Sequence, residues 1–188
     1  MPPKARITRE MVIDAAFAIT REQGIASVNA RAVSEALGCS TQPVMYHFRR
    51  IEDMKRAVYA KADAYHTAFI TQPGEGNPML SIGMNYIRFA RQEKHLFRLL
   101  FQTNEFEGKS VVGLMEDEAL APVIAVLSGA TGVPHKQARS MFRLLFLLVH
   151  GYASMLANND LAYDEAEIIR DLTRAFAGVL QTMKEEEP

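Results

Sequence analysis

The amino-acid sequence predicts an all-α protein. Apolar residues recur three and four positions apart along most of the chain, which is the spacing of one face of an α-helix. No segment combines strict alternation of apolar and polar residues with an enrichment of β-branched side chains, so no strand is expected. The stretch TQPGEGNP at residues 71–78 contains two prolines and two glycines, and it is the clearest break between helices.

Four helices are expected before this break. The first begins near Thr8 and ends before Gly24, which is a typical C-cap residue. Asn29 can cap a second helix, and Ser40 can cap a third helix of barely two turns. A helix this short is not stable on its own, so its neighbours have to hold it. A long fourth helix is expected at residues 51–70.

After the break, the same periodicity predicts further helices over residues 79–93, 94–104, 134–158 and 163–184. Residues 111–132 are less regular, because Gly113 and Pro122 interrupt the pattern. The run LLFLLV at 144–149 is apolar all round, which is typical of a helix that is buried on more than one side.

The composition is that of a soluble globular protein. The chain has 188 residues, of which 48% are hydrophobic and 23% are charged. No apolar run approaches the roughly 20 residues that cross a bilayer, and the basic start MPPKARITRE is not followed by the apolar stretch of a secretory signal. We therefore expect a cytoplasmic protein without a membrane partner. The single cysteine, Cys39, excludes an internal disulfide.

The net charge of −1 conceals an asymmetry along the chain. Residues 1–56 contain nine Lys and Arg against six Asp and Glu, whereas residues 57–188 contain twelve against sixteen. A basic segment on an acidic body favours contact with a polyanion. The difference is modest, so charge alone does not decide for nucleic acid.

The second and third expected helices, with the tight turn between them, form a helix-turn-helix, in which a short helix enters the major groove of DNA. Thr41 and Gln42 lie on the first turn of the short helix, where they can reach base edges. At the far end of this helix, the phosphate backbone can be held by Tyr46, His47, Arg49 and Arg50. For Tyr46 and His47 alone, the alternative interpretation is that they only cap a small core.

Residues 8–54 resemble the DNA-binding domain of the TetR family of bacterial transcriptional repressors. The resemblance is carried by Gly24, by SVNARAVSEALGCS at 27–40, and by YHFRRIEDM at 46–54, in the order and spacing of the family pattern. It implies a homodimeric repressor that a small-molecule effector releases from a palindromic operator in double-stranded DNA.

The resemblance also implies which residues touch DNA. Asn29 and Arg31 correspond to phosphate contacts, Thr41 and Gln42 to base-reading positions, and Phe48 to the buried aromatic that anchors the short helix. The full set of expected DNA-binding residues is Asn29, Arg31, Ser40, Thr41, Gln42, Met45, Tyr46, His47, Arg49 and Arg50.

Three residues depart from the family pattern. Met45 stands where a tyrosine is usual, and it can touch a thymine methyl but cannot donate a hydrogen bond. Pro43 removes a donor at a common Thr or Asn position. Ile51 replaces the lysine that normally opens the fourth helix, and Arg49 or Arg50 can supply that charge. These departures concern single contacts and not the mode of binding.

The family architecture implies a DNA-binding domain at residues 1–50 and a ligand-binding and dimerisation domain at 51–188, connected by the helix 51–70. Methionine and aromatic side chains form adaptable cavities. The expected ligand-binding residues are Tyr86, Phe89, Phe97, Phe101, Met115, Phe142, Phe146 and His150. The alternative is that these residues are plain core, and a histidine in an apolar helix is more often a core residue than a ligand contact.

A dimer through the last two helices is also implied. Residues 168–183 carry a continuous apolar stripe, which is too wide to leave exposed on a monomer. The expected interface residues are Phe146, Ile168, Leu172, Phe176, Val179, Leu180 and Met183. The alternative is that the stripe belongs to the core of a single copy.

Nothing in the sequence indicates catalysis. The five histidines form no metal-ligand pattern, Cys39 has no His and Asn at a recognisable spacing, and no phosphate-binding glycine loop occurs. We therefore expect no enzyme, no catalytic residue, no metal and no cofactor. The alternative to a repressor is a small-molecule or protein binding module of the same fold, with a DNA-binding helix degenerate at Met45 and Ile51.

Overall fold

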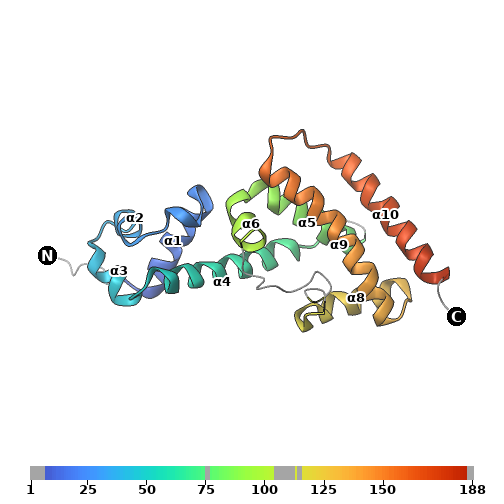
Figure 1. Cartoon of the computed structure of the whole chain (residues 1–188), viewed down its shortest axis with the longest axis horizontal. Helices are drawn as coiled ribbons and strands as arrows, with labels where there is room; N and C mark the ends of the chain where they lie inside the picture. Colours follow the sequence, from blue (N-terminus) through green and yellow to red (C-terminus); the bar gives the residue numbers. More distant parts are fainter. Residues whose placement is uncertain (1–6, 75–76, 104–112, 114–115, 186–188) are drawn as a thin grey trace. The chain divides into compact units, whose positions relative to one another are not determined.

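The structure is a computed structural model that describes residues 7–74, 77–103, 113 and 116–185, and every regular element in these residues is helical (Figure 1). The predicted all-α fold is confirmed. By its contacts the chain divides into two compact units, Met1–Ala68 with Gln92–Thr103, and Phe69–Arg91 with Asn104–Pro188. The first unit thus extends beyond the boundary expected at residue 50 and includes a segment from the middle of the chain.

The first unit is built around α1, which packs against α2, α3 and α6. Its elements are α1 (Arg9–Gln23), the 3-10 turn η1 (Ile25–Ser27), α2 (Ala30–Ala36), α3 (Thr41–His47), most of α4 (Ile51–Ile70) and α6 (Lys94–Phe101). Its buried apolar side chains include Val12, Ala16, Val28, Val33, Val44, Phe48, Met54, Val58, Leu96 and Phe97. Each helix therefore contributes to one common core.

Side chains cap two of these helices, and a third cap is missing. The Thr8 hydroxyl accepts a hydrogen bond from Met11 N at the start of α1, and Asn29 Oδ1 accepts one from Ala32 N, 2.9 Å away, at the start of α2. Ser40 occupies the N-cap position of α3, but its side chain makes no capping hydrogen bond. Ser40 thus stands at the predicted N-cap position, but without the hydrogen bond expected of a cap. Its hydroxyl is exposed instead.

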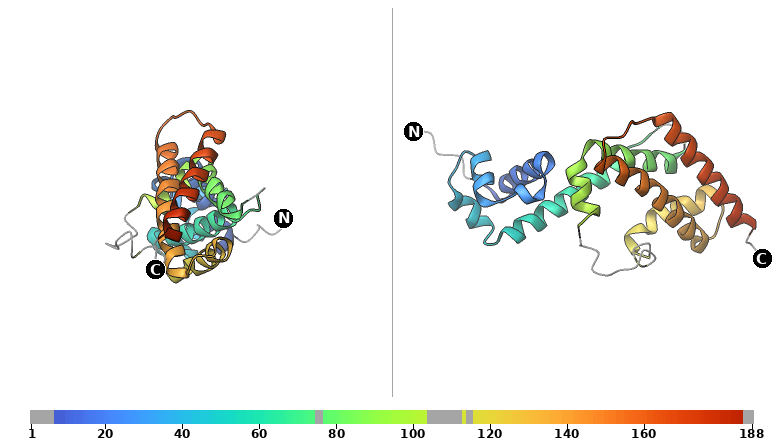
Figure 2. Two further views of the ribbon diagram at one scale, coloured as in Figure 1. Left: turned by 90° about the vertical axis from the view of Figure 1, so that its right-hand side faces the viewer. Right: turned by 45° about the horizontal axis from the view of Figure 1, so that its top comes forward.

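The second unit contains most of α5 (Pro78–Gln92), then η2 (Glu118–Leu120), α8 (Ala121–Thr131), α9 (His135–Asn158) and α10 (Glu165–Glu185). Helix α9 lies beside both α8 and α10 (Figures 1 and 2). The expectation of irregular structure over residues 111–132 is wrong for α8. Pro122 lies in the first turn of this helix, where its missing N–H breaks no internal hydrogen bond.

A hydrophobic cluster joins α8, α9 and α10. Its buried members are Ile124, Leu127, Val133, Ala138, Met141 and Met183. Partly buried residues packed against it include Met79, Phe142, Leu145, Phe176, Val179 and Leu180. Much of the apolar stripe of α10 therefore contributes to the core of its own chain.

A series of hydrogen bonds holds the C-terminal end of α4 in the second unit. The buried Asn85 of α5 donates hydrogen bonds from Nδ2 to the carbonyls of Ile70 and Gln72, at 3.3 and 3.0 Å. Arg88 donates to Asn85 Oδ1 at 3.2 Å and forms an ion pair with Glu165 at the start of α10. Because the last carbonyls of a helix have no partner inside it, Asn85 acts as a C-cap supplied by another helix.

The N-cap residues of α2 and α3, Asn29 and Ser40, provide a matched test of this local structure. We expect Asn29→Ala to lower the free energy of unfolding by about 1 kcal/mol, because α2 loses a side-chain acceptor. Ser40→Ala should change it by less than about 0.5 kcal/mol, because no capping bond is lost. Urea denaturation of both variants measures the difference. An equal loss in both would contradict the assignment of the caps.

Candidate nucleic-acid interface and regulatory core

Helix α3 is anchored on one face and exposed on the other. Val44 and the residue that ends the helix, Phe48, are buried, and the guanidinium of Arg9 lies 4.8 Å from the centre of the Phe48 ring. The outer face carries Thr41, Gln42, Met45 and Tyr46, all exposed. Among the large hydrophobic residues that the structure describes, Tyr46 is the most exposed, with 76% of its surface accessible.

His47 differs from the other expected DNA contacts. It is half-buried, and its Nε2 lies 2.9 Å from the carbonyl oxygen of Ile7, the residue before the cap of α1. The ring of Tyr46 meets the His47 ring edge to face, with centroids 5.2 Å apart. His47 therefore ties the start of the first helix to the end of α3, and only its other nitrogen remains for a phosphate.

The remaining candidate residues are exposed on the first unit, and two of them have local partners. Asn29 uses Oδ1 for its cap and donates from Nδ2 to the carbonyl of Ser27 at 3.2 Å. Arg31 pairs with Glu35 one turn later, with Nε and Oε1 2.8 Å apart. Arg49 and Arg50 are exposed directly after α3. An exposed ion pair is weak, so Arg31 can exchange its carboxylate for a phosphate at little cost.

The expected ligand-binding residues fall into two groups. Tyr86, Phe142, Phe146 and His150 lie together in the second unit. Phe97 and Phe101 are neighbours on α6 and belong to the first unit.

Two further residues stand apart from these groups. Phe89 is fully buried and meets Phe69 edge to face, with centroids 5.4 Å apart. Met115 lies outside the described residues.

The group in the second unit is an aromatic stack with one polar contact. Phe142, Phe146 and His150 follow one another at four-residue spacing on α9, with centroids 6.0 and 5.5 Å apart. Tyr86 of α5 places its hydroxyl 2.9 Å from His150 Nδ1. Burial lowers the pKa of His150 and raises the pKa of Tyr86, so both are neutral at pH 7 and their hydrogen bond joins two uncharged groups.

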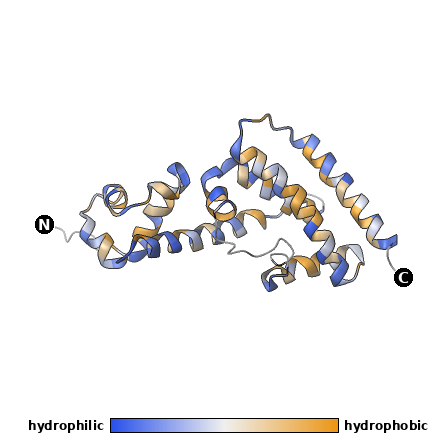
Figure 3. Ribbon diagram, viewed as in Figure 1, coloured by the Kyte–Doolittle hydropathy of each residue, from blue (hydrophilic) through white to orange (hydrophobic). Residues whose placement is uncertain are grey.

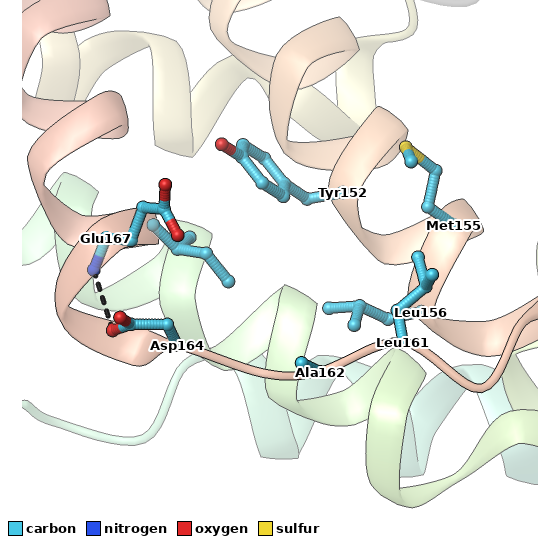
Figure 4. Close-up of a pocket in the computed structure, with 8 residues that line it drawn as sticks. Tyr152, Met155, Leu156, Leu161, Ala162, Asp164 and Glu167 are labelled. Carbon is cyan, nitrogen blue, oxygen red and sulfur yellow. Dashed lines mark hydrogen bonds between the residues drawn. The ribbon is translucent and has the colours of Figure 1, made fainter.

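An open pocket of about 130 Å³ lies where α9 gives way to α10 (Figure 4). It is lined by Tyr152, Met155, Leu156, Leu161, Ala162, Asp164, Glu167 and Ile168. The hydroxyl of Tyr152 donates to Asp171 at 2.6 Å, and this bond raises the pKa of Tyr152 to about 12. None of the residues expected to bind a ligand lines this pocket. Within the described residues, no three His, Cys, Asp or Glu side chains gather as a metal site.

The apolar stripe of α10 does not by itself require a second copy. Ile168, Leu172 and Met183 are buried within the chain, and Phe176, Val179 and Leu180 pack against the hydrophobic cluster described above. Periodicity indicated which face of the helix is apolar, but it could not tell an internal partner from an external one.

Helix α9, in contrast, leaves apolar surface uncovered. Leu144, Leu147 and Met155 are 44%, 45% and 56% exposed, and Figure 3 shows hydrophobic residues concentrated in the middle of this helix. Within the single chain, the run 144–149 thus keeps two leucines exposed. Among the described residues, α9 alone is long and apolar enough to cross a membrane, yet only 22% of its most apolar window is buried. Length and composition of this kind also fit a helix that pairs with a second copy.

A comparison with protein families identifies the family of this chain. Residues 79–181, more than half of the chain, match the family model described as Tetracyclin repressor-like, C-terminal domain. The chain belongs to the TetR family. No curated protein matches it. The matched part of this TetR-family protein runs from α5 into α10, and the helix-turn-helix geometry of the first unit lies before it.

Four residues with structural roles in the two units were not indicated by any sequence pattern. The Ile7 carbonyl, Arg21, Asn85 and Glu93 act through contacts with residues distant in sequence. Contacts of this kind have no local spacing signature. Only the unusual burial of Asn85 and Glu93 in the folded chain makes them visible.

Acid should destabilise this TetR-family protein through His66, which is buried in α4 against the ring of Phe101. Burial lowers the pKa of His66 from 6.5 to about 4. Between these values the unfolded chain binds a proton that the folded chain does not, so the free energy of unfolding falls as the pH drops through this window. The part due to His66 reaches at most about 3 kcal/mol.

Urea denaturation at pH 7, 6 and 5 measures this loss in the wild type and in His66→Gln, whose side chain does not titrate. The variant should show the flatter dependence on pH. Parallel curves for the two proteins would contradict the role of His66.

Proposed function

We propose that the protein is a cytoplasmic, homodimeric transcriptional repressor that binds a two-fold symmetric operator and is released by a small effector. Membership of the TetR family supports a regulator and not an enzyme. The observation that carries the DNA-binding part is the outer face of α3, where Thr41, Gln42, Met45 and Tyr46 are exposed on a helix anchored through Phe48. A short helix that is anchored on one face and exposes polar and apolar side chains on the other can enter the major groove of DNA.

The exposed residues suggest a division of roles. Thr41 and Gln42 lie in the first turn of α3 and are proposed to read base edges, since Gln can form two hydrogen bonds with adenine. Tyr46, Arg49 and Arg50 lie at its far end and are proposed to hold phosphates.

The remaining expected contacts fit around these two groups. Met45 can add apolar contact with a thymine methyl. Asn29, Arg31 and Ser40 are proposed to make further phosphate contacts, and His47 acts mainly by positioning α3 through its contact with Ile7.

The proposed dimer uses the uncovered face of α9. Leu144, Leu147, Gly151 and Met155 follow one another at three- and four-residue spacing and are all exposed. Gly151 lies inside the helix, and no described side chain comes within 4 Å of the position that its Cβ would occupy. A glycine in a helix interior costs about 1 kcal/mol relative to alanine. A glycine at position 151 would let a second helix approach α9 closely, and this contact would offset that cost. Phe176, Val179 and Leu180 then support the interface from behind as part of the core.

The proposed effector site is the aromatic stack of the second unit. Phe142, Phe146 and His150 offer flat apolar faces, and the neutral pair of Tyr86 and His150 offers a hydrogen-bonding group without charge. Such a site fits a small, mostly apolar, uncharged molecule. The molecule acts as an inducer if it binds more tightly to the conformation that cannot bind the operator.

DNA binding can be tested with two substitutions on the same surface. Gln42→Ala should lose about 1–3 kcal/mol of discrimination at one base pair of each half-site, because a base contact disappears. Arg50→Ala should weaken binding to all sequences alike and lower the slope of log affinity against log salt by about 1, because a phosphate contact disappears.

Fluorescence anisotropy with DNA from upstream of its own gene, at several salt concentrations, separates the two effects. Arg170→Ala on α10 is a matched control that removes an exposed arginine from the second unit. If the wild type binds no DNA above the non-specific level, the alternative of a binding module with a degenerate DNA-binding helix is favoured.

The dimer is tested by charge on the exposed face of α9. The double substitution Leu144→Glu and Leu147→Glu should give folded monomers, because both side chains are exposed in the single chain and like charges would then meet at the interface. Val126→Glu on α8, at a residue of similar exposure, should leave the dimer intact. Light scattering gives the mass, and circular dichroism gives the fold. A stable dimer of the double variant would place the interface elsewhere.

A further inference from the structure

A buried carboxylate, that of Glu93, connects the segment 92–103 to the other helices of the first unit. Glu93 lies between α5 and α6, and only 5% of its side chain is accessible. Its Oε2 accepts a hydrogen bond from Arg21 Nε at 2.7 Å, and its Oε1 accepts one from the other end of the same guanidinium. The hydroxyl of Tyr65 adds a third hydrogen bond, to Oε1, at 3.2 Å. Arg21 comes from α1 and Tyr65 from α4, so one carboxylate connects three helices.

Aromatic contacts hold the partners of Glu93 in place. The guanidinium of Arg21 lies 5.6 Å from the centre of the Tyr65 ring, and the Tyr65 ring meets Phe17 edge to face at 5.7 Å. The hydrogen bond to Glu93 raises the pKa of Arg21, and burial raises the pKa of Tyr65. At neutral pH Glu93 is therefore held by a charged guanidinium and a neutral phenol.

A buried pair of a carboxylate and a guanidinium adds little to the free energy of unfolding, but it favours one relative position of the helices that carry the two groups. Removing a charged group from water costs several kcal/mol, which the attraction between the partners only offsets when the geometry is good. Apolar residues of the same size would often stabilise the contact equally well. The two parallel hydrogen bonds from a guanidinium to a carboxylate, however, fix distance and orientation together. Glu93 therefore determines how α6 docks on α1.

The surrounding contacts agree with a defined docking. Leu96 and Phe97 of α6 are fully buried in the first unit, directly after Glu93. At Gly24, which ends α1 with a φ of 86°, a Cβ would come within 3.3 Å of His95 Nδ1. The glycine thus allows both the turn after α1 and the close approach of His95.

The path of the chain makes this docking a link between the units. Residues 69–91 and 104–188 belong to the second unit, whereas residues 92–103 belong to the first. The chain enters the first unit one residue before Glu93 and leaves it after α6. A conformational change in the second unit can therefore reach the DNA-reading helices through the ends of α6 as well as through α4.

We propose that Glu93 is a positioning residue for DNA binding, because its contacts with Arg21 and Tyr65 dock α6 on the DNA-reading helices and so transmit the state of the regulatory unit to α3. This inference rests on the proposed function. Linkage then requires reciprocity: DNA binding stabilises the docking of α6, and loss of the docking weakens DNA binding by the same factor.

The experiment compares Glu93→Gln and the milder Tyr65→Phe with the wild type. Glu93→Gln keeps the shape but removes the charge, and Tyr65→Phe removes one hydrogen bond only. Asp14→Asn is the matched control, because it removes a carboxylate of α1 from an exposed ion pair with Lys61 in the same unit. Two quantities are measured well below the melting temperature: hydrogen exchange of the α6 amides, with and without DNA, and affinity for DNA from upstream of its own gene.

We expect DNA to slow exchange in α6 of the wild type. Glu93→Gln should speed that exchange and weaken DNA binding roughly tenfold, within the usual range of coupling between sites. Its base preference should stay unchanged, since no base contact is touched. Tyr65→Phe should shift both quantities in the same direction by less, and Asp14→Asn should shift neither.

Two results would overturn the proposal, and they differ in what they reject. If Glu93→Gln or Tyr65→Phe speeds exchange in α6 while DNA affinity stays at the wild-type value, the contact is only structural and the proposed function stands. If the wild type itself binds the DNA no better than an unrelated duplex, the proposed function fails and this inference with it. Should Glu93→Gln fold too poorly to measure, Tyr65→Phe alone decides between the first outcome and the expected one.

Discussion

A helix of seven residues cannot hold itself in water, because forming its first turn costs more than its few internal hydrogen bonds return. The outer face of α3 therefore depends on how its inner face is held. Val44 and Phe48 are buried, Arg9 lies over the Phe48 ring, and His47 contacts the Ile7 carbonyl. All these anchors are on one side, so the opposite side is free for contacts outside the protein. The contacts that hold α3 do not involve its exposed residues. These residues can therefore vary without loss of the helix.

Buried polar groups define the geometry of both units. Asn85 caps the last carbonyls of α4, Glu93 binds Arg21, and Tyr86 binds His150. Each group would be costly to bury alone, and each finds its partner on a different helix. Apolar packing would tolerate small sliding motions between these helices, whereas a hydrogen bond tolerates little. Helix α4 is held in this way at two places near its C-terminal end, through the hydroxyl of Tyr65 in the first unit and through the Ile70 carbonyl, which Asn85 binds, in the second.

Much of the fold could be predicted from the sequence, because its determinants are local. Apolar spacing located the long helices, Gly24 has the positive φ expected of a helix end, and Asn29 caps α2. Ser40 occupies the predicted cap position without making a capping hydrogen bond, which the residue type alone does not reveal. The stripe of α10 was correctly seen as apolar, but periodicity carries no information about what covers it. Phe97 and Phe101 were grouped with the expected ligand-binding residues because aromatic side chains can form a cavity, and contacts place their helix, α6, with the first unit.

No single peptide bond separates the two compact units, because residues 92–103 of the first unit lie in the sequence between two segments of the second. A fragment that ends at Ala68 would lack α6, and the surface of α1 that meets α6 would face water, with Arg21 deprived of its carboxylate. The first unit is therefore not a module that recombination could move intact to another protein. Sequence changes in α6 must therefore stay compatible with its packing on α1 and with the ring contact between Phe101 and His66 of α4.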